Sequence, residues 1–298
     1  MPTVTVETES LSVPGYIVMD EESIRPPKSD DGSQALHPSI KFYVSAGQVE
    51  GSTLGAKATA EGLNTTASNE AAHAEGIKTS ASAKGAHAEG NETRAQGDYS
   101  HAEGGLRTFT NGDPARHTIA KGACSHAEGQ GSLASGEASH AEGYSYTYGV
   151  ASHAEGNSTT GSENDPDSGK CAHSEGWNTQ ATGHSAHSEG YSFFNDDFEA
   201  KQVLASGIGA HAEGWGTQAT GKGSHAEGRE TVAEGDYSHA EGGWSSIGDD
   251  IRPSQAIGAC SHAEGGGAIA KGYSSHAEGW STAWGAYSHA EGASWTGQ

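Results

Sequence analysis

Residues 100–104 read Ser-His-Ala-Glu-Gly, and the string His-Ala-Glu-Gly, with His-Ser-Glu-Gly as its variant, occurs 14 times in this chain of 298 residues. Successive repeat histidines lie 13 or 14 residues apart, except at four steps of 20 to 25 residues. A short fixed period is typical of a solenoid, in which each repeat is one coil that contacts mainly its neighbours. The sequence therefore predicts a stack of coils with four insertions.

Each coil is predicted to consist of two half-turns. In the coil that starts at His126, Ala127 and Gly129 are followed seven residues later by Ala134 and Gly136. Glycine and serine make poor helices, whereas seven residues suit a strand of about five residues and a tight corner. The pattern indicates an all-β fold, a parallel β-roll solenoid of 13–14-residue coils.

Strand alternation assigns each side chain to an inner or an outer face. In residues 100–104 the Ser, Ala and Gly point one way, and the His and Glu point the other way. The residue before each repeat histidine is Ala or Ser, which fits a narrow lumen. The outward ladder is predicted to consist of His73, His87, His101, His126, His140, His153, His173, His187, His211, His225, His239, His262, His276 and His289, with Glu75, Glu89, Glu103, Glu128, Glu142, Glu155, Glu175, Glu189, Glu213, Glu227, Glu241, Glu264, Glu278 and Glu291.

The ladder is predicted to be structural. Its imidazoles and carboxylates suit hydrogen bonds within one chain or across a seam between chains, and the alternative is a ladder that faces solvent. Chelation of Zn or Ni, where ladders of separate chains meet, is a further alternative. Because the regular array resembles no single closed site, we expect no metal and no cofactor.

The pattern resembles the head repeat of the YadA-like trimeric autotransporter adhesins, which Ser100-His101-Ala102-Glu103-Gly104 matches position by position. The resemblance covers roughly residues 48 to 295. It implies a left-handed parallel β-roll in a bundle of three chains. Independently, a lumen of Ala, Ser and Gly buries little apolar area. Because burial stabilises a fold by roughly 25 cal/mol per Å² of apolar surface, a single roll gains little from it. Packing of rolls against one another would add burial, so we expect oligomers, and the resemblance implies that the oligomer is a homotrimer.

The repeat divides the chain into two parts. Residues 1–47 lack it and are predicted to be a small β or extended attachment segment, and residues 48–298 form the β-roll domain, with Thr59 in the histidine position of an early coil. The insertions are expected to leave one corner of the roll as loops. They lie near 106–121, 157–170, 191–207 and 244–258.

Composition excludes several functional classes. The formal net charge of −23 argues against nucleic acid as a partner, since phosphate binding needs a basic surface. No apolar stretch reaches 18 residues, so no membrane span is expected. Because His and Glu recur in every coil, no pair is distinguished as acid and base, and we expect no enzyme.

The His-Ala-Glu-Gly array of this chain looks like the arrays of phage fibre and tail-associated proteins. The N-terminal residues have neither a basic start nor an apolar segment, so we expect no secretory signal. Together these features favour a homotrimeric phage fibre or appendage, docked by its N-terminus to a larger virion assembly that forms in the host cytoplasm. The alternative is the head of a secreted bacterial adhesin at the cell surface. A glycan-degrading tailspike is a minor alternative.

Aromatic residues follow several repeats, and rings beside Asn and Asp are a candidate platform for host surface glycans. The alternative is that they pack insertions onto the roll. The candidates are Tyr144, Trp177, Tyr191, Phe193, Phe194, Phe198, Trp215 and Trp280. Cys124, Cys171 and Cys260 each precede a repeat histidine by two residues, and we expect free, small, buried thiols.

Overall fold

The computed structural model describes residues 18–19, 24–25, 54–109, 114–165, 167–194, 200–247, 250–293 and 295–296. The chain divides into two units, Met1–Phe42 and Tyr43–Gln298, close to the predicted boundary at residue 47. In the first unit, β1 (Val18–Met19) and β2 (Ile24–Arg25) form an antiparallel pair. The rest of the predicted attachment segment lies outside the described residues.

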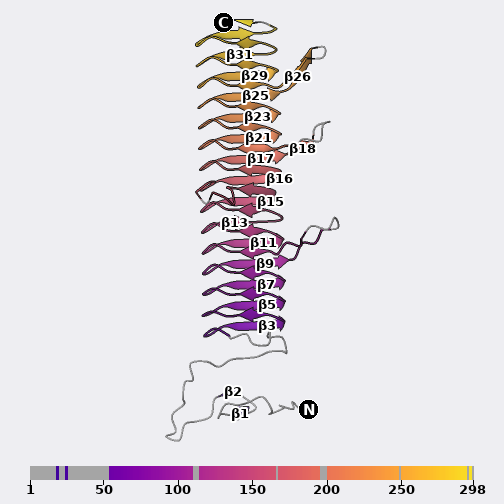
Figure 1. The fold of residues 1–298 in the computed structure, drawn as a ribbon, viewed down its shortest axis with the longest axis vertical. Coiled ribbons are helices and arrows are strands. Elements are labelled where there is room, and N and C mark those ends of the chain that lie inside the picture. Colours follow the sequence, from indigo (N-terminus) through magenta and orange to yellow (C-terminus); the bar gives the residue numbers. More distant parts are fainter. Residues whose placement is uncertain are drawn as a thin grey trace. The chain divides into compact units, whose positions relative to one another are not determined.

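The second unit is a stack of parallel strands in which each coil supplies a long and a short strand (Figure 1). The long strands are β3 (Thr59–Leu63), β5 (His73–Ile77), β7 (His87–Asn91), β9 (His101–Gly105), β11 (His126–Gln130), β13 (His140–Ala141), β15 (His153–Thr160), β16 (His173–Ala181), β17 (His187–Tyr191), β21 (His211–Trp215), β23 (His225–Arg229), β25 (His239–Gly243), β29 (His262–Gly266), β31 (His276–Glu278) and β33 (His289–Glu291). β15 and β16 continue through both half-turns.

The second half-turn of the other coils supplies the short strands. These are β4 (Thr66–Ala67), β6 (Ser80–Ala81), β8 (Arg94–Ala95), β10 (Ile119–Ala120), β12 (Leu133–Ala134), β14 (Tyr146–Thr147), β20 (Val203–Ala205), β22 (Gln218–Ala219), β24 (Val232–Ala233), β28 (Gln255–Ala256), β30 (Ile269–Ala270), β32 (Thr282–Ala283) and β34 (Trp295–Thr296). All 28 long and short strands belong to one sheet, and the described residues contain no helix. The predicted all-β parallel roll is therefore confirmed.

The coils stack in strict register. β9 and β11 pair so that His101 lies beside His126, although 25 residues separate them in the sequence. Thr59 pairs with His73, as expected for a coil in which Thr replaces the histidine. Insertions therefore leave the order of the ladder unchanged, because each new coil forms its backbone hydrogen bonds with the coil before it.

The lumen is narrow and lined by small side chains. Among the described residues, every buried hydrophobic side chain is alanine except Val203. Buried Thr and Ser complete the lining, and several donate to backbone carbonyls, as Thr93 Oγ1 does to the carbonyl of Glu89 at 2.9 Å. The predicted inward face is confirmed for Ala and Ser, and the apolar area buried in each coil is small. The glycine that follows each repeat glutamate is half-buried or exposed, so its predicted place in the lumen is wrong.

One corner of each coil lies two residues before the repeat histidine, where the backbone is left-handed. Tyr99 and Cys124 occupy this position with φ of 58° and 55°. The three cysteines are free, as predicted, but all three are exposed, so the expectation of buried thiols is wrong. At this corner the side chain projects outward, away from the lumen.

The four insertions leave the roll at two different corners. Three leave after the long strands β9, β17 and β25, and the chain returns to the roll at β10, β20 and β28. Two of these three contain antiparallel pairs, β18 (Phe193–Phe194) with β19 (Ala200–Lys201), and β26 (Ser245–Ile247) with β27 (Asp250–Arg252). The fourth leaves after Thr160, at the opposite corner, so the expectation of a single corner is wrong (Figure 1).

Candidate functional site: the histidine and glutamate ladder

The 14 repeat histidines form one continuous stack along the roll. Each is the first residue of a long strand and points outward, because its neighbours on both sides in the sequence line the lumen. Successive ring centroids lie 4.6 to 4.9 Å apart, with interplanar angles of 0° to 19°. These separations match the spacing of neighbouring strands in a sheet.

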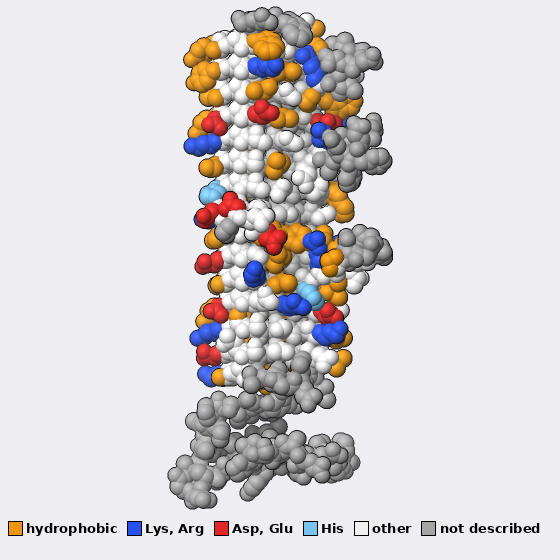
Figure 2. Space-filling view, in the orientation of Figure 1, with side chains coloured by type: hydrophobic (Ala, Val, Ile, Leu, Met, Phe, Trp, Pro, Cys, Tyr) orange, Lys and Arg blue, Asp and Glu red, His pale blue; other side chains and the backbone are white. Residues whose placement is uncertain are grey.

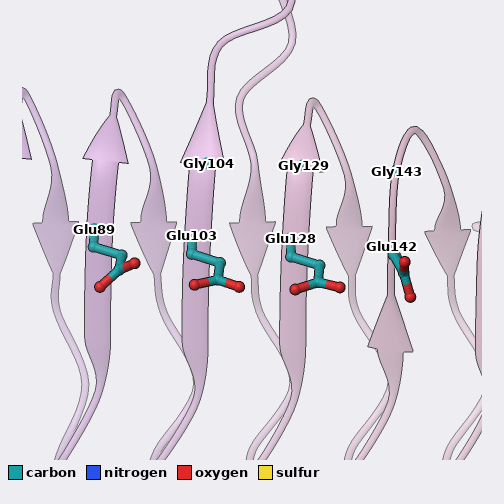
Figure 3. A pocket seen from close by; sticks show the side chains of 7 residues that line it. All are labelled: Glu89, Glu103, Gly104, Glu128, Gly129, Glu142 and Gly143. Atoms are coloured by element: carbon teal, nitrogen blue, oxygen red, sulfur yellow. The ribbon is translucent and has the colours of Figure 1, made fainter.

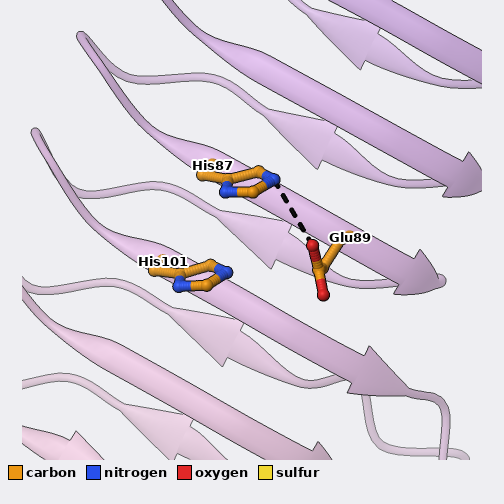
Figure 4. Close-up of side chains that lie close together, drawn as sticks. All are labelled: His87, Glu89 and His101. Carbon is orange, nitrogen blue, oxygen red and sulfur yellow. Dashed lines mark ion pairs between the residues drawn. The ribbon is translucent and has the colours of Figure 1, made fainter.

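The glutamates lie beside the histidines, two residues further along each strand. Oε2 of Glu89 lies 3.6 Å from Nε2 of His87 on the same strand (Figure 4). Oε1 of Glu103 lies 3.8 Å from Nε2 of His126 in the next coil. Such distances exceed a hydrogen bond. The structure therefore brings the predicted partners together, but the expected hydrogen bonds between them are not formed at these positions.

The glutamates also line a shallow acidic groove beside the stack. Figure 3 shows Glu89, Glu103, Glu128 and Glu142 in a row, with Gly104, Gly129 and Gly143 completing the lining. Glycine follows each glutamate, so no side chain screens the carboxylates on that side. The negative charges therefore repeat at the spacing of the coils.

The edge of the imidazole that faces the glutamates is closed to water in nearly all rungs. Thirteen ladder histidines, from His73 to His276, have an Nε2 atom that solvent does not reach and that has no hydrogen-bond partner. The same side chains are 34% to 38% exposed, so their other edge faces outward. A polar ring atom buried without a partner costs free energy.

Burial and stacking change the acid–base behaviour of the ladder. Burial, and then the neighbouring imidazoles, lower the pKa of His101, His140, His211 and His239 below the usual 6.5, against the opposing effect of the glutamates. These four rings are therefore neutral at pH 7. Burial penalises the charged form of the imidazole, and a charged ring in the stack would also be repelled by any other charged ring within 5 Å of it.

Acidification is expected to destabilise the roll. The unfolded chain binds protons at these four histidines near pH 6.5, whereas the folded chain binds them only at lower pH, so stability falls as the pH drops through 6.5. The loss levels off below the folded pKa values. Thermal unfolding at pH 7.5, 6.5 and 5.0 measures it. His140→Gln should weaken the dependence and His184→Gln, outside the ladder, should not. A midpoint that rises towards pH 5 would contradict this prediction.

The aromatic candidates separate into two groups. Tyr144 and Trp280 are covered by insertion arginines, with Arg107 Cζ 3.9 Å from the centroid of Tyr144 and Arg252 Cζ 4.0 Å from that of Trp280. At these two rings, side chains of the insertions lie against the roll. The sequence analysis did not single out these arginines, because insertions lack the period that locates side chains in the coils.

The other group forms an exposed aromatic ridge, defined as Trp177, Tyr191 and Trp215. They are 53%, 47% and 51% exposed and occupy equivalent positions in β16, β17 and β21. The rings of Tyr191 and Trp215 lie 6.0 Å apart. Phe193 and Phe194 lie in β18, where only the backbone is described, and Phe198 lies outside the described residues.

The face drawn in Figure 2 shows scattered charged and hydrophobic side chains and no column of histidines. The regular array of imidazoles and carboxylates is thus a property of one side of the roll.

The described part of the chain includes no helix that could cross a membrane. Comparison with models of known protein families finds no match, and comparison with curated proteins finds none.

Proposed function

We propose that the chain is a non-enzymatic rod that assembles as a left-handed homotrimer and serves as a fibre or appendage of a phage virion. The proposal rests on the resemblance of its repeat to trimeric adhesin heads and phage fibre arrays. The observation that carries it is the uniform ladder face, which we define as the outward surface of the repeat histidines and glutamates. From His73 to His276 the exposure of the histidine side chains varies by only 4 percentage points, so no described insertion covers this face.

The composition of the lumen supports assembly of several rolls. Alanine is the smallest side chain that contributes apolar area, so each coil gains little from the hydrophobic effect. Contact between rolls removes further surface from water without changing the coils themselves. The ladder face suits such contact because it continues through all four insertions. At a seam, carboxylates of one copy would accept hydrogen bonds from the outer imidazole edge of another.

We propose two attachment sites, one in the N-terminal segment and one at the aromatic ridge. The N-terminal segment would dock to a larger assembly, and the aromatic ridge would contact glycans of the host surface. Exposed Trp and Tyr rings present flat apolar faces of the kind that pack against sugars. This observation also fits the alternative of a bacterial adhesin head on the cell surface. Neighbouring tail or capsid genes would favour the virion, and a downstream membrane anchor would favour the adhesin.

Light scattering after size exclusion at pH 7.5 tests the assembly. The chain has a mass of 30.4 kDa, so a homotrimer is expected near 91 kDa, three times that value. A stable species of 30 kDa at micromolar concentration would contradict the proposal. The same measurement at pH 5 examines the seam, because protonated ladders should repel one another and dissociate. A trimer unchanged at pH 5 would place the ladder away from the seam.

A further inference from the structure

We propose that the ladder binds divalent first-row transition-metal ions within a single chain. Each ion would be held by the Nε2 atom of one histidine and by carboxylate oxygens of two successive glutamates. This inference goes beyond the proposed function and does not depend on it. It also differs from the sequence-based expectation, which assigned no metal and considered chelation only where ladders of separate chains meet.

The distances in the ladder match an ion between its ligands. Nε2 of His126 lies 3.9 Å from Oε2 of Glu128 and 3.8 Å from Oε1 of Glu103. Nε2 of His262 repeats this arrangement, at 3.8 Å from Glu264 and 3.7 Å from Glu241. Two metal–ligand bonds of about 2.0 to 2.2 Å span at most about 4.4 Å. An ion therefore fits between these atoms with small movements of the side chains.

The parallel stack decides which groups share an ion. A metal lies in the plane of the imidazole that binds it, along the Nε2 lone pair. Because successive rings are nearly parallel and 4.6 to 4.9 Å apart, an ion bound to His126 is too distant from Nε2 of His140 to be bound by both. Sets of two histidines and one glutamate do cluster, with ligand atoms within 4.8 Å of one another. The ring planes nevertheless favour one histidine and two carboxylates for each ion.

The buried Nε2 atoms are the second observation that points to a ligand. Thirteen of them lack a hydrogen-bond partner and are closed to water. If the proton is on Nε2, its carboxylate neighbours are too distant to accept it. If the proton is on Nδ1, a lone pair faces negative oxygens, and a cation between them would satisfy both.

Charge sets the number of ions. Each rung contributes one carboxylate, so one divalent ion for every two rungs neutralises the ladder. Ions in adjacent rungs would lie near 5 Å apart and leave an excess of positive charge, which disfavours full occupancy. The 14 rungs therefore accommodate about seven ions. A set of one imidazole and two carboxylates suits Zn²⁺, Ni²⁺ or Cu²⁺ better than Mg²⁺.

Calorimetric titration of the untagged, chelator-treated chain with Zn²⁺ at pH 7.5 tests the proposal. We expect uptake of about seven ions per chain, little heat with Mg²⁺, and a rise in the unfolding temperature that chelator reverses. The stoichiometry is counted per chain, so failure to form a trimer would not change it. Absence of saturable Zn²⁺ uptake would overturn the proposal.

A pair of matched variants locates the ions. The ladder variant combines Glu103→Gln, Glu128→Gln and Glu142→Gln, and the control combines Glu137→Gln, Glu163→Gln and Glu234→Gln, which are exposed positions outside the ladder. Both remove three negative charges. The ladder variant should lose about two ions per chain and the control none. Equal losses in both would show diffuse attraction to an acidic surface and overturn the proposal.

A measurement on the unaltered chain covers the case in which the ladder variant does not fold. Electron paramagnetic resonance of bound Cu²⁺ detects coupling to an imidazole nitrogen. We expect one coupled nitrogen per ion at low occupancy. A spectrum of Cu²⁺ bound by oxygen alone would place the ions outside the ladder and overturn the assignment.

Discussion

Gly214→Ala is expected to destabilise the roll by about 3 kcal/mol or more, whereas Gly209→Ala should change stability by less than about 1 kcal/mol. Gly214 follows the glutamate of its coil and has a φ of 116°. A Cβ atom built there would lie 2.1 Å from the carbonyl oxygen of Gly228 in the next coil. Neither strand can move away, because β21 and β23 are each paired with strands on both sides.

Gly209 is a matched control five residues earlier in the chain. Its φ is 64°, and a Cβ atom there would meet nothing within 4 Å. Ala71, Ala138 and Ala151 occupy the equivalent corner in other coils with φ of 54° to 56°. Denaturant unfolding of both variants at one protein concentration measures the difference. Equal stability of the two variants would contradict the close approach of the glycine column.

Ala226→Leu is expected to cost about 3 kcal/mol, because the lumen has no space for three additional carbon atoms. Ala226 is fully buried, and its neighbours in register are Ala212 and Ala240. A larger side chain must therefore separate the two halves of the coil, which would break hydrogen bonds between coils. Thermal unfolding and far-ultraviolet circular dichroism measure the loss.

Ala226→Ser is the conservative comparison and should be nearly neutral. Ser174 and Ser188 occupy the equivalent position in two coils, and Oγ of Ser174 lies 2.9 Å from Oγ1 of Thr179. Thr231 occupies the same place relative to Ala226, so the introduced hydroxyl has a partner. A serine variant as unstable as the leucine variant would indicate that polarity, rather than volume, limits the lumen.

The coil could be predicted in detail because it depends on contacts of fixed period. Alternation along a strand placed His101 and Glu103 outside and Ala102 inside, and parallel stacking then put equivalent residues one above another. The candidate site followed from the same rule, since a ladder is a repeated side chain on an outward position. Such inference needs no knowledge of residues distant in sequence.

The insertions could not be predicted in this way. The contacts of Arg107 with Tyr144 and of Arg252 with Trp280 join residues that share no period, and they decide which aromatic rings remain exposed. The corner at which residues 161–169 leave the roll depended on how far β15 extends. Exposure of the cysteines depended on a left-handed corner that small residues at the same position did not reveal.

The stacked coil, the small-residue lumen and the order of the ladder follow from the repeat alone, because backbone pairing between adjacent coils repeats whatever the alternating pattern specifies. The separation of imidazole from carboxylate and the burial of Nε2 follow only from the folded structure. These depend on the rotamers that close stacking allows and on the space left beside each glycine. The chemistry proposed for the ladder therefore depends on the exact distances between imidazole and carboxylate atoms. A repeat pattern does not specify these distances.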